Sequence, residues 1–305
     1  MIATEKILHG VSVACVTPMT DDGAAVDYDA IAPYVDFLCD RGVDGLFVVG
    51  TTGEGCLLSL DERRRAITEF VHAARGRLVV VPQCGSLVAE ETRELIHQSS
   101  AVGADGAAVV TPFYFSYTQT ALYDYYAGVL EMAHGFPIYA YNIPQLTNNA
   151  VDVRTMARLA AAYPNFCGVK DSSGNASGIL EYVRALPPRI AVIVGSDSLF
   201  LSLLFSGIHG CVSGPGSVIP EPFVKVYAEF RNGALDDARA SQKVLTGLSE
   251  AVGGGGDLDL LKKVLAWRGL KAGSVRAPLP RVSPERERTT KTQFQKLWEA
   301  AGFTL

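Results

Sequence analysis

Eight short apolar runs, separated by segments with helical spacing, dominate the hydrophobic pattern of this chain. They recur at intervals of roughly 20 to 35 residues, the rhythm of repeated strand–helix units. Most are continuously apolar, which is typical of parallel strands covered on both faces. The runs are VSVACVT from Val11, GLFVVG from Gly45, LVVVPQ from Leu78, GAAVVT from Gly106, PIYAYN from Pro137, FCGVK from Phe166, AVIVGS from Ala191 and GCVSG from Gly210.

The segments between the runs carry helix signals. Ser59 and Glu62 form the capping-box pattern that opens a helix. Asp152 precedes another helix that stops before Pro164, and residues 118–133 place tyrosine, leucine and alanine at helical spacing. Four further helices are expected beyond the eighth run, over residues 222–231, 234–251, 258–267 and 292–301.

This alternation predicts an α/β protein: a (β/α)8 TIM barrel with a C-terminal helical extension. The competing fold is an open, doubly wound sheet, but the sequence lacks a G-x-G-x-x-G after its first run. Eight runs of similar length also favour closure into a barrel. We expect residues 1–230 to form the catalytic barrel and residues 231–305 the extension, with the glycine run 253–256 as a loop or hinge.

Composition and charge narrow the functional class. Of 305 residues, 48% are hydrophobic and 19% are charged, an ordinary globular composition. The formal net charge is −5, so neither a nucleic acid nor a membrane surface is expected as a partner. The charge-dense stretch 281–291 mixes both signs and is interpreted as a solvated loop leading into the last helix.

The cysteines and the apolar runs bear on the cellular location of the protein and on metal binding. The six cysteines include no C-x-x-C pair, so we expect reduced thiols and no zinc or other metal site. No run is long enough to span a membrane, and residues 1–7 lack the pattern of a signal peptide. These observations favour a cytoplasmic protein.

In a barrel of this type, the carboxyl ends of the strands face the active site. Lys170 ends the sixth run and is followed by a Gly/Ser turn. Taken alone, the segment favours an ordinary lysine that points into water. At the rim of a core, however, desolvation would lower the pKa of the amine and supply the neutral nucleophile that a Schiff base requires.

Other strand ends carry matching chemistry. After the second run, Gly50-Thr51-Thr52-Gly53 predicts a tight turn whose N–H groups and hydroxyls could hold a small carboxylate, although such a stretch is more often an ordinary turn. Tyr141 and Tyr114 follow the fifth and fourth runs, where a phenol beside a lysine could move protons. Each tyrosine alone is more often a packing residue. The eighth run ends with little side-chain bulk, which leaves room for a ligand.

Three motifs occur in order at barrel spacing: Gly-Thr-Thr-Gly-Glu from Gly50, Tyr-Asn-x-Pro from Tyr141 and Gly-Val-Lys-Asp from Gly168. This combination resembles the N-acetylneuraminate lyase and dihydrodipicolinate synthase superfamily of class I, Schiff-base, pyruvate-dependent aldolases. The resemblance extends from the first apolar run to Val-Arg-Ala-Pro-Leu from Val275. It implies a homotetramer built as a dimer of dimers, with no metal or organic cofactor.

The resemblance also implies roles for individual residues. Lys170 would form the imine with the keto carbon of pyruvate or a pyruvate-derived substrate. Tyr141 would move protons at the imine and the aldol hydroxyl, and Thr51 would relay them. Tyr114 would reach from one subunit into the relay of its neighbour.

Substrate binding is expected from a second set of residues. Thr52 and its backbone neighbours, including Gly50, would bind the pyruvate carboxylate, and Val212 would offer a backbone contact. Lysine-pathway synthases have an arginine two residues after the proline of Tyr-Asn-x-Pro, where this chain has Leu146. Because leucine cannot make a bidentate bond to a carboxylate, Leu146 favours the sugar-acid branch. Asn148 stands where many members have glycine, so either asparagine keeps left-handed geometry or the loop differs.

The leading hypothesis is therefore a lyase that cleaves, or condenses, a 2-keto-3-deoxy sugar acid or related 4-hydroxy-2-oxo acid, with pyruvate and an aldehyde as partners. A hydro-lyase or deaminase that acts on a 2-oxo acid through the same imine is the first alternative. Dihydrodipicolinate synthase, disfavoured by Leu146, and a non-catalytic keto-acid-binding protein follow.

Overall fold

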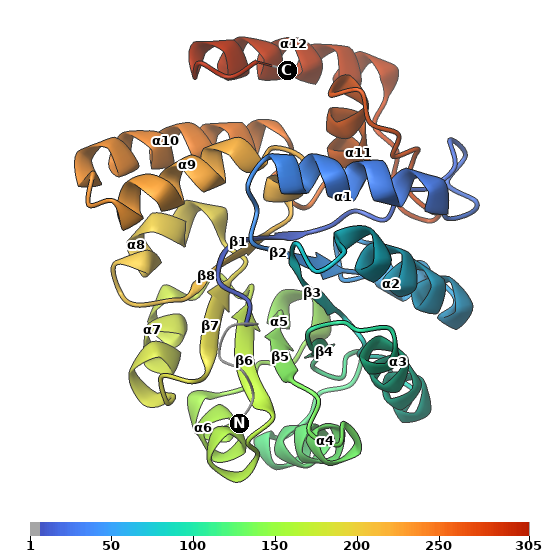
Figure 1. The fold of residues 1–305 in the computed structure, drawn as a ribbon, viewed down its shortest axis with the longest axis vertical. Helices are drawn as coiled ribbons and strands as arrows, with labels where there is room; N and C mark the ends of the chain where they lie inside the picture. Colours follow the sequence, from blue (N-terminus) through green and yellow to red (C-terminus); the bar gives the residue numbers. More distant parts are fainter. Residues whose placement is uncertain (1–6, 305) are drawn as a thin grey trace.

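Eight parallel strands form a single sheet at the centre of the molecule, with helices around it (Figure 1). The computed structural model describes residues 7–304, so the stretch on which the signal-peptide expectation rests lies almost wholly outside the described residues. Each apolar run contains one strand, as predicted. The strands are β1 (Gly10–Ala14), β2 (Gly45–Val48), β3 (Val79–Pro82), β4 (Ala107–Val110), β5 (Ile138–Asn142), β6 (Phe166–Asp171), β7 (Ala191–Val194) and β8 (Gly210–Ser213).

The strand order is β3-β2-β1-β8-β7-β6-β5-β4, so β3 and β4 are the two ends of the sheet. A parallel bridge between Gln83 and Ala108 joins these ends. The Cys84 N–H also donates to the Ala108 carbonyl at 2.8 Å. The sheet therefore curls round to meet itself, and the predicted TIM barrel is confirmed.

Helices follow the strands and cover the outside of the barrel (Figure 1). The capping box of Ser59 and Glu62 is present, and the Asp152 side chain caps its helix as expected. The helices around the barrel are α1 (Ile31–Asp40), α2 (Leu60–Ala74), α3 (Ala89–Ala101), α4 (Gln119–Met132), α5 (Pro144–Thr147), α6 (Val153–Ala162), α7 (Ala176–Ala185), α8 (Phe200–Leu204) and α9 (Pro220–Arg231).

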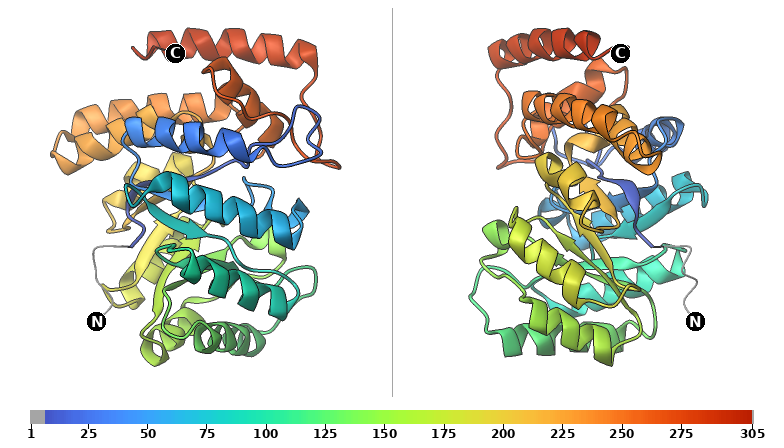
Figure 2. Two further views of the ribbon diagram at one scale, coloured as in Figure 1. Left: turned by 45° about the vertical axis from the view of Figure 1, so that its right-hand side comes forward. Right: turned by 90° about the vertical axis from the view of Figure 1, so that its left-hand side faces the viewer.

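The C-terminal extension consists of α10 (Leu235–Ala251), α11 (Leu258–Trp267) and α12 (Pro284–Ala300). α10 packs beside α9, and α12 forms the outermost layer over α10 and α11 (Figure 2). The expected start of the last helix was wrong, because α12 begins at residue 284 and not at 292. Ser283 caps the helix with its side chain and Pro284 occupies its first turn, so much of the charged stretch is helical.

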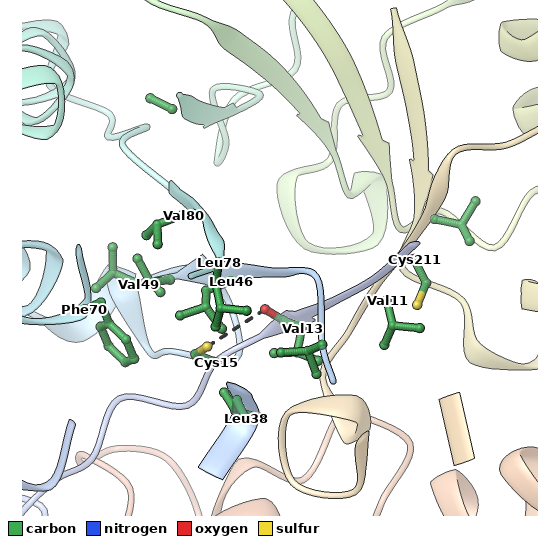
Figure 3. Close-up of a cluster of buried hydrophobic side chains, with 14 of the residues drawn as sticks. Val11, Val13, Cys15, Leu38, Leu46, Val49, Phe70, Leu78, Val80 and Cys211 are labelled. Carbon is green, nitrogen blue, oxygen red and sulfur yellow. Dashed lines mark hydrogen bonds between the residues drawn. The ribbon is translucent and has the colours of Figure 1, made fainter. Parts of the chain in front are cut away.

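Two apolar cores lie on opposite faces of the barrel wall. The larger one fills the space between strands and helices; Val13, Leu46 and Val80 belong to it and meet Leu38 and Phe70 from α1 and α2 (Figure 3). The smaller core fills the inside of the barrel, where alternate strand residues point inward. This smaller core forms the floor beneath the predicted site. Its members include Phe47, Val81, Ala108, Tyr139, Tyr141, Cys167, Ile193 and Val212.

A β-bulge in β6 determines which way Lys170 points. The register of β5 and β6 pairs Ile138 with Phe166 and then Tyr139 with Gly168, which leaves Cys167 as the extra residue. Cys167 and Gly168 consequently both face the inside of the barrel: Cys167 packs in the inner core, and a Cβ on Gly168 would lie 2.5 Å from the Tyr139 ring. The bulge shifts the alternation by one residue and turns Lys170 inward.

Among residues 7–304, no helix is long and apolar enough to cross a membrane. In the same part of the chain, no cluster of three or more His, Cys, Asp or Glu could hold a metal ion. All six cysteines are free thiols.

Candidate active site

Lys170 lies near the carboxyl end of β6 and is buried, with 3% of its surface exposed. Its Nζ atom sits 3.6 Å from the centroid of the Phe47 ring and 4.1 Å from that of the Tyr141 ring. Burial lowers the pKa of the Lys170 ammonium from 10.5 to about 7. Two aromatic faces favour the charged form by only about 1–2 kcal/mol each, which is not enough to offset the loss of solvation. A large share of Lys170 is thus a neutral, nucleophilic amine at neutral pH.

The strand register places Tyr141 directly beside Lys170. Tyr141 pairs with Lys170 across β5 and β6, and Asn142 pairs with Asp171. The Asn142 side chain donates to Asp171 Oδ2 at 2.7 Å, and its Oδ1 accepts from the Val151 N–H at 3.1 Å. These bonds pin the ends of both strands, so the neighbouring Tyr141 and Lys170 are held side by side.

Tyr141 links Lys170 to the turn after β2. Its hydroxyl lies 3.2 Å from Thr51 Oγ1, close enough for a hydrogen bond in either direction. Burial raises the pKa of Tyr141 above 10, while the hydroxyls of Thr51 and Ser172 oppose this shift and do not cancel it. The phenol is therefore protonated at neutral pH and is able to donate a proton to a basic group nearby.

The turn that carries Thr51 and Thr52 has an unusual backbone. Val49 and Glu54 flank it, and both adopt left-handed geometry, with φ of 49° and 57°. For residues other than glycine, each such conformation costs about 1–3 kcal/mol and persists only where the surroundings hold it. The turn is closed by the Gly55 N–H, which donates to the Gly50 carbonyl at 2.9 Å.

Three of the predicted binding residues lie in or beside this arrangement. A Cβ on Gly50 would lie 2.8 Å from the Phe47 ring, so the bare glycine lets Phe47 lie where Lys170 contacts it. Val212 is buried inside the barrel on β8. Thr52, also buried, lies next to the end of β8, because a Cβ on Gly214 would be 3.3 Å from Thr52 Oγ1.

Three predicted residues are not buried: Thr51, which is exposed but bonds to Tyr141, and Tyr114 and Leu146, which lie outside the group. Tyr114 is 80% exposed and has a φ of 77°, and Leu146 on α5 is 61% exposed. The rings of Tyr114 and Phe115 meet edge to face at 5.0 Å, and both lie at the surface. Asn148 adopts left-handed geometry with a φ of 61°, so asparagine keeps the conformation that glycine would supply.

Sequence reasoning missed two residues of the site. Phe47 was part of an apolar run and carried no sign that its ring would lie against Lys170. Ser172 was recognised only as part of a turn, yet its hydroxyl acts on the pKa of Tyr141. Its position two residues after a strand-end lysine was the available signal.

A barrel with a buried lysine, a phenol and a hydroxyl at the carboxyl ends of its strands is the architecture of a Schiff-base lyase. A sequence model of the dihydrodipicolinate synthetase family matches residues 7–297. The 4-hydroxy-tetrahydrodipicolinate synthase of Sorangium cellulosum is 36% identical over 272 residues, covering 89% of this chain and 90% of the relative.

Solved structures of members of this family have the same fold. The dihydrodipicolinate synthase of Aquifex aeolicus superposes with a TM-score of 0.89 at 31% identity, over 95% of this chain and 98% of the other. YagE, a prophage protein of E. coli K12 crystallised with pyruvate, gives a TM-score of 0.90 at 25% identity, over 95% and 99%. The chain belongs to the dihydrodipicolinate synthetase family and is a lyase of the class I aldolase type.

Proposed function

We propose that this protein cleaves a 2-keto-3-deoxy sugar acid, or a related 4-hydroxy-2-oxo acid, into pyruvate and an aldehyde through a Schiff base on Lys170. The observation that carries the proposal is the buried amine of Lys170, whose pKa is about 7, held between Phe47 and Tyr141. The structure of YagE, a related protein in complex with pyruvate, supports pyruvate as a ligand.

The first step uses the neutral amine. Lys170 Nζ attacks the keto carbon, the carbinolamine loses water, and a protonated imine remains. Thr52 and the N–H groups around Gly50 are suited to the substrate carboxylate, because a hydroxyl and backbone N–H groups meet in this turn, and the Glu54 carboxylate at its end is paired with Lys262. This binding would fix the keto carbon over Lys170.

The second step breaks the carbon–carbon bond. A base takes the proton from the C4 hydroxyl, the C3–C4 bond breaks, and its electron pair neutralises the iminium to give an enamine and an aldehyde. Tyr141 is that base: its phenol gives up its proton when the carbinolamine loses water, and the phenolate that remains takes the C4 proton, with Thr51 as the next group along at 3.2 Å. The enamine then takes a proton at C3, and water hydrolyses the imine to release pyruvate and the free lysine.

Leu146 supports the sugar-acid branch over the synthases of the lysine pathway. Its exposed aliphatic side chain on α5 offers no cation to a second substrate carboxylate. The relatives named as 4-hydroxy-tetrahydrodipicolinate synthases favour the synthase as the second candidate. The two candidates differ in the aldehyde that joins pyruvate, and both use the same imine.

Product analysis distinguishes these candidate functions. The protein is incubated with pyruvate and a panel of aldehydes, which includes hydroxyaldehydes of two to six carbons and the amino-acid semialdehyde of the lysine pathway. Formation of 4-hydroxy-2-oxo acids from hydroxyaldehydes supports the proposal. A cyclised product from the semialdehyde alone favours the synthase. Loss of water or ammonia from a 2-oxo acid, with its carbon chain intact, would identify a hydro-lyase or deaminase. Binding of pyruvate without any turnover would identify a non-catalytic binding protein.

The pKa of Lys170 predicts how adduct formation depends on pH. Because only the neutral amine attacks, the rate at which borohydride traps pyruvate on Lys170 should rise about tenfold per pH unit below 7 and level off above it. Trapping rates between pH 5 and 9, measured by mass spectrometry, check this. A rate that keeps rising up to pH 10 would mean that the lysine is as basic as an exposed one.

The exposed aromatic residues that follow β4 support a proposal about oligomeric state. We propose a homotetramer, a dimer of dimers, in which Tyr114 of one copy completes the proton relay of the next. The 80% exposure of Tyr114, the 64% exposure of Phe115 and the nearby exposed Leu146 support a surface that a second copy covers. Six free thiols fit a cytoplasmic location for this assembly.

Mixing two inactive variants tests this exchange. Tyr114→Phe and Lys170→Ala should each be inactive or nearly so. After dissociation and reassembly together, a measurable fraction of wild-type turnover should return, because a chain with intact Lys170 receives Tyr114 from its partner. Sedimentation should give four chains per particle. Mixed particles with no recovered activity would show that Tyr114 acts within its own chain, and a fully active Tyr114→Phe variant would show that Tyr114 has no part in the relay.

A further inference from the structure

The strained turn that carries Thr51 and Thr52 needs something to hold it. Glu54, at its end, has a φ of 57° and is 3% exposed. Backbone hydrogen bonds inside the turn do not explain the left-handed geometry of a glutamate, since asparagine or glycine would adopt it more readily. The restraint on the turn therefore comes from the side chain of Glu54.

Glu54 points away from the barrel mouth into the C-terminal extension. Its Oε1 forms an ion pair at 2.5 Å with Nζ of Lys262 on α11, and both side chains are fully buried. Its Oε2 accepts the Arg276 N–H at 2.7 Å. Lys262 Nζ donates in addition to the Ser274 carbonyl at 2.8 Å. The ion pair and the hydrogen bond of this carboxylate thus both come from residues that follow the barrel in the sequence.

The C-terminal segment that supplies these groups is itself held in place by hydrogen bonds. Asp259 on α11 accepts from the Ser274 hydroxyl at 2.8 Å and from the Val282 N–H at 2.8 Å, one oxygen each. The Arg276 guanidinium bonds both Glu62 oxygens at 2.6 and 2.8 Å, at the start of α2. Residues 274–282 thus lie against the turn and against α2, the helix that follows it.

We propose that Lys262 is a positioning residue of the active site: through its buried ion pair with Glu54, it fixes the Thr51-Thr52 turn in the geometry that the relay needs. Removing Lys262 leaves a buried carboxylate without its cation, and Glu54 is then free to relax toward ordinary backbone geometry. The turn would move, and Thr51 would leave hydrogen-bond distance of Tyr141. The C-terminal extension is on this account part of the catalytic apparatus. The inference rests on the proposed function of Lys170 and Tyr141.

The test uses Lys262→Met, Glu54→Gln and the double variant in the full-length protein. We expect Lys262→Met to lower kcat/KM roughly 10- to 100-fold, because small displacements of catalytic groups have effects of this size. KM for the 2-oxo acid should rise as kcat falls, since Thr52 and Thr51 lie on the same turn. The double variant should lose less than the two single effects combined, because no unpaired charge remains. Hydrogen exchange of the amides of residues 50–55 should become faster.

Trp298→Phe is the matched control. Trp298 is fully buried in α12 and its ring packs against that of Phe294 at a tilt, so the substitution weakens the extension without touching Glu54. It should lower Tm while leaving kcat, KM and exchange of residues 50–55 at wild-type values. If Lys262→Met lowers Tm and changes those three no more than the control does, the pair is only a stabilising contact and the proposal is wrong.

Borohydride trapping separates this outcome from failure of the proposed function. Wild-type protein that does not trap pyruvate on Lys170 would overturn the Schiff-base proposal. The exchange measurement decides the role of Lys262 in either case, because it needs no substrate. Unchanged protection of residues 50–55 in Lys262→Met overturns the inference even if turnover falls.

Discussion

Replacing Lys170 with alanine should lower turnover by a factor on the order of 10⁴ to 10⁶, the range found when a covalent nucleophile is removed. No other described lysine can substitute, because the site around Tyr141 and Thr51 contains one amine, 3% exposed. Pyruvate and borohydride should leave a mass adduct on wild-type Lys170 and none on the variant. Full turnover in Lys170→Ala would exclude the imine mechanism.

The thermal stability of a second variant, Lys170→Met, tests the burial of the amine. The depressed pKa means that the unfolded chain binds a proton more tightly than the folded one, so the buried amine opposes folding. That cost is absent above pH 10.5, grows as the pH falls, and reaches at most about 5 kcal/mol below pH 7. Lys170→Met should therefore unfold at a higher temperature than wild type at pH 7, with a smaller difference near pH 10. A variant less stable than wild type at pH 7 would contradict the burial.

The barrel was predictable because its signal is repeated. Eight apolar runs without polar alternation indicate strands buried on both faces, and their spacing leaves room for one helix each. The last helix was harder, since a mixed-charge surface on α12 has no strong apolar period until Phe294 and Trp298. Ser283 followed by Pro284 was the local signal for its true start.

The candidate site was predictable for a different reason. The strand-end rule converts a list of residues into a place, so Lys170, Tyr141 and Thr51 could be expected together. The bulge at Cys167 could not, because it depends on how β5 and β6 pair, and without it Lys170 would face the helices. Glu54 and Lys262 could not be paired either, since two charged residues far apart in sequence give no periodic signal.

The contact between Phe47 and Lys170 is the clearest limit of sequence reasoning here. Phe47 sits in an apolar strand, where any aromatic residue would be interpreted as core. Its ring lies on the inner face of the barrel, and Gly50 leaves space for it against the amine. That arrangement needs the three-dimensional closure of the barrel, which brings β2 opposite β6.

Replacing Tyr141 with phenylalanine should lower kcat about 10²- to 10⁴-fold, the usual contribution of a positioned acid or base. The ring that packs on Phe47 at 5.4 Å is kept, so the pocket should retain its shape and pyruvate should still be trapped on Lys170. Steady-state kinetics together with adduct mapping check both parts. Because burial raises the pKa of Tyr141, the phenol is protonated before the reaction starts, and the variant lacks that proton at every pH below 10.

Tyr139→Phe provides the matched control, because Tyr139 lies on the same strand, is equally buried, and donates no proton in the proposed reaction. Its hydroxyl instead accepts the Leu8 N–H at 3.1 Å, away from Lys170. That variant should lose stability and keep kcat. Thr51→Val should reduce kcat less than Tyr141→Phe, and adding it to Tyr141→Phe should cost little more, because Thr51 acts only through the phenol. Independent, multiplying effects of the two substitutions would show that Thr51 contacts the substrate by itself and that the two hydroxyls do not form one relay.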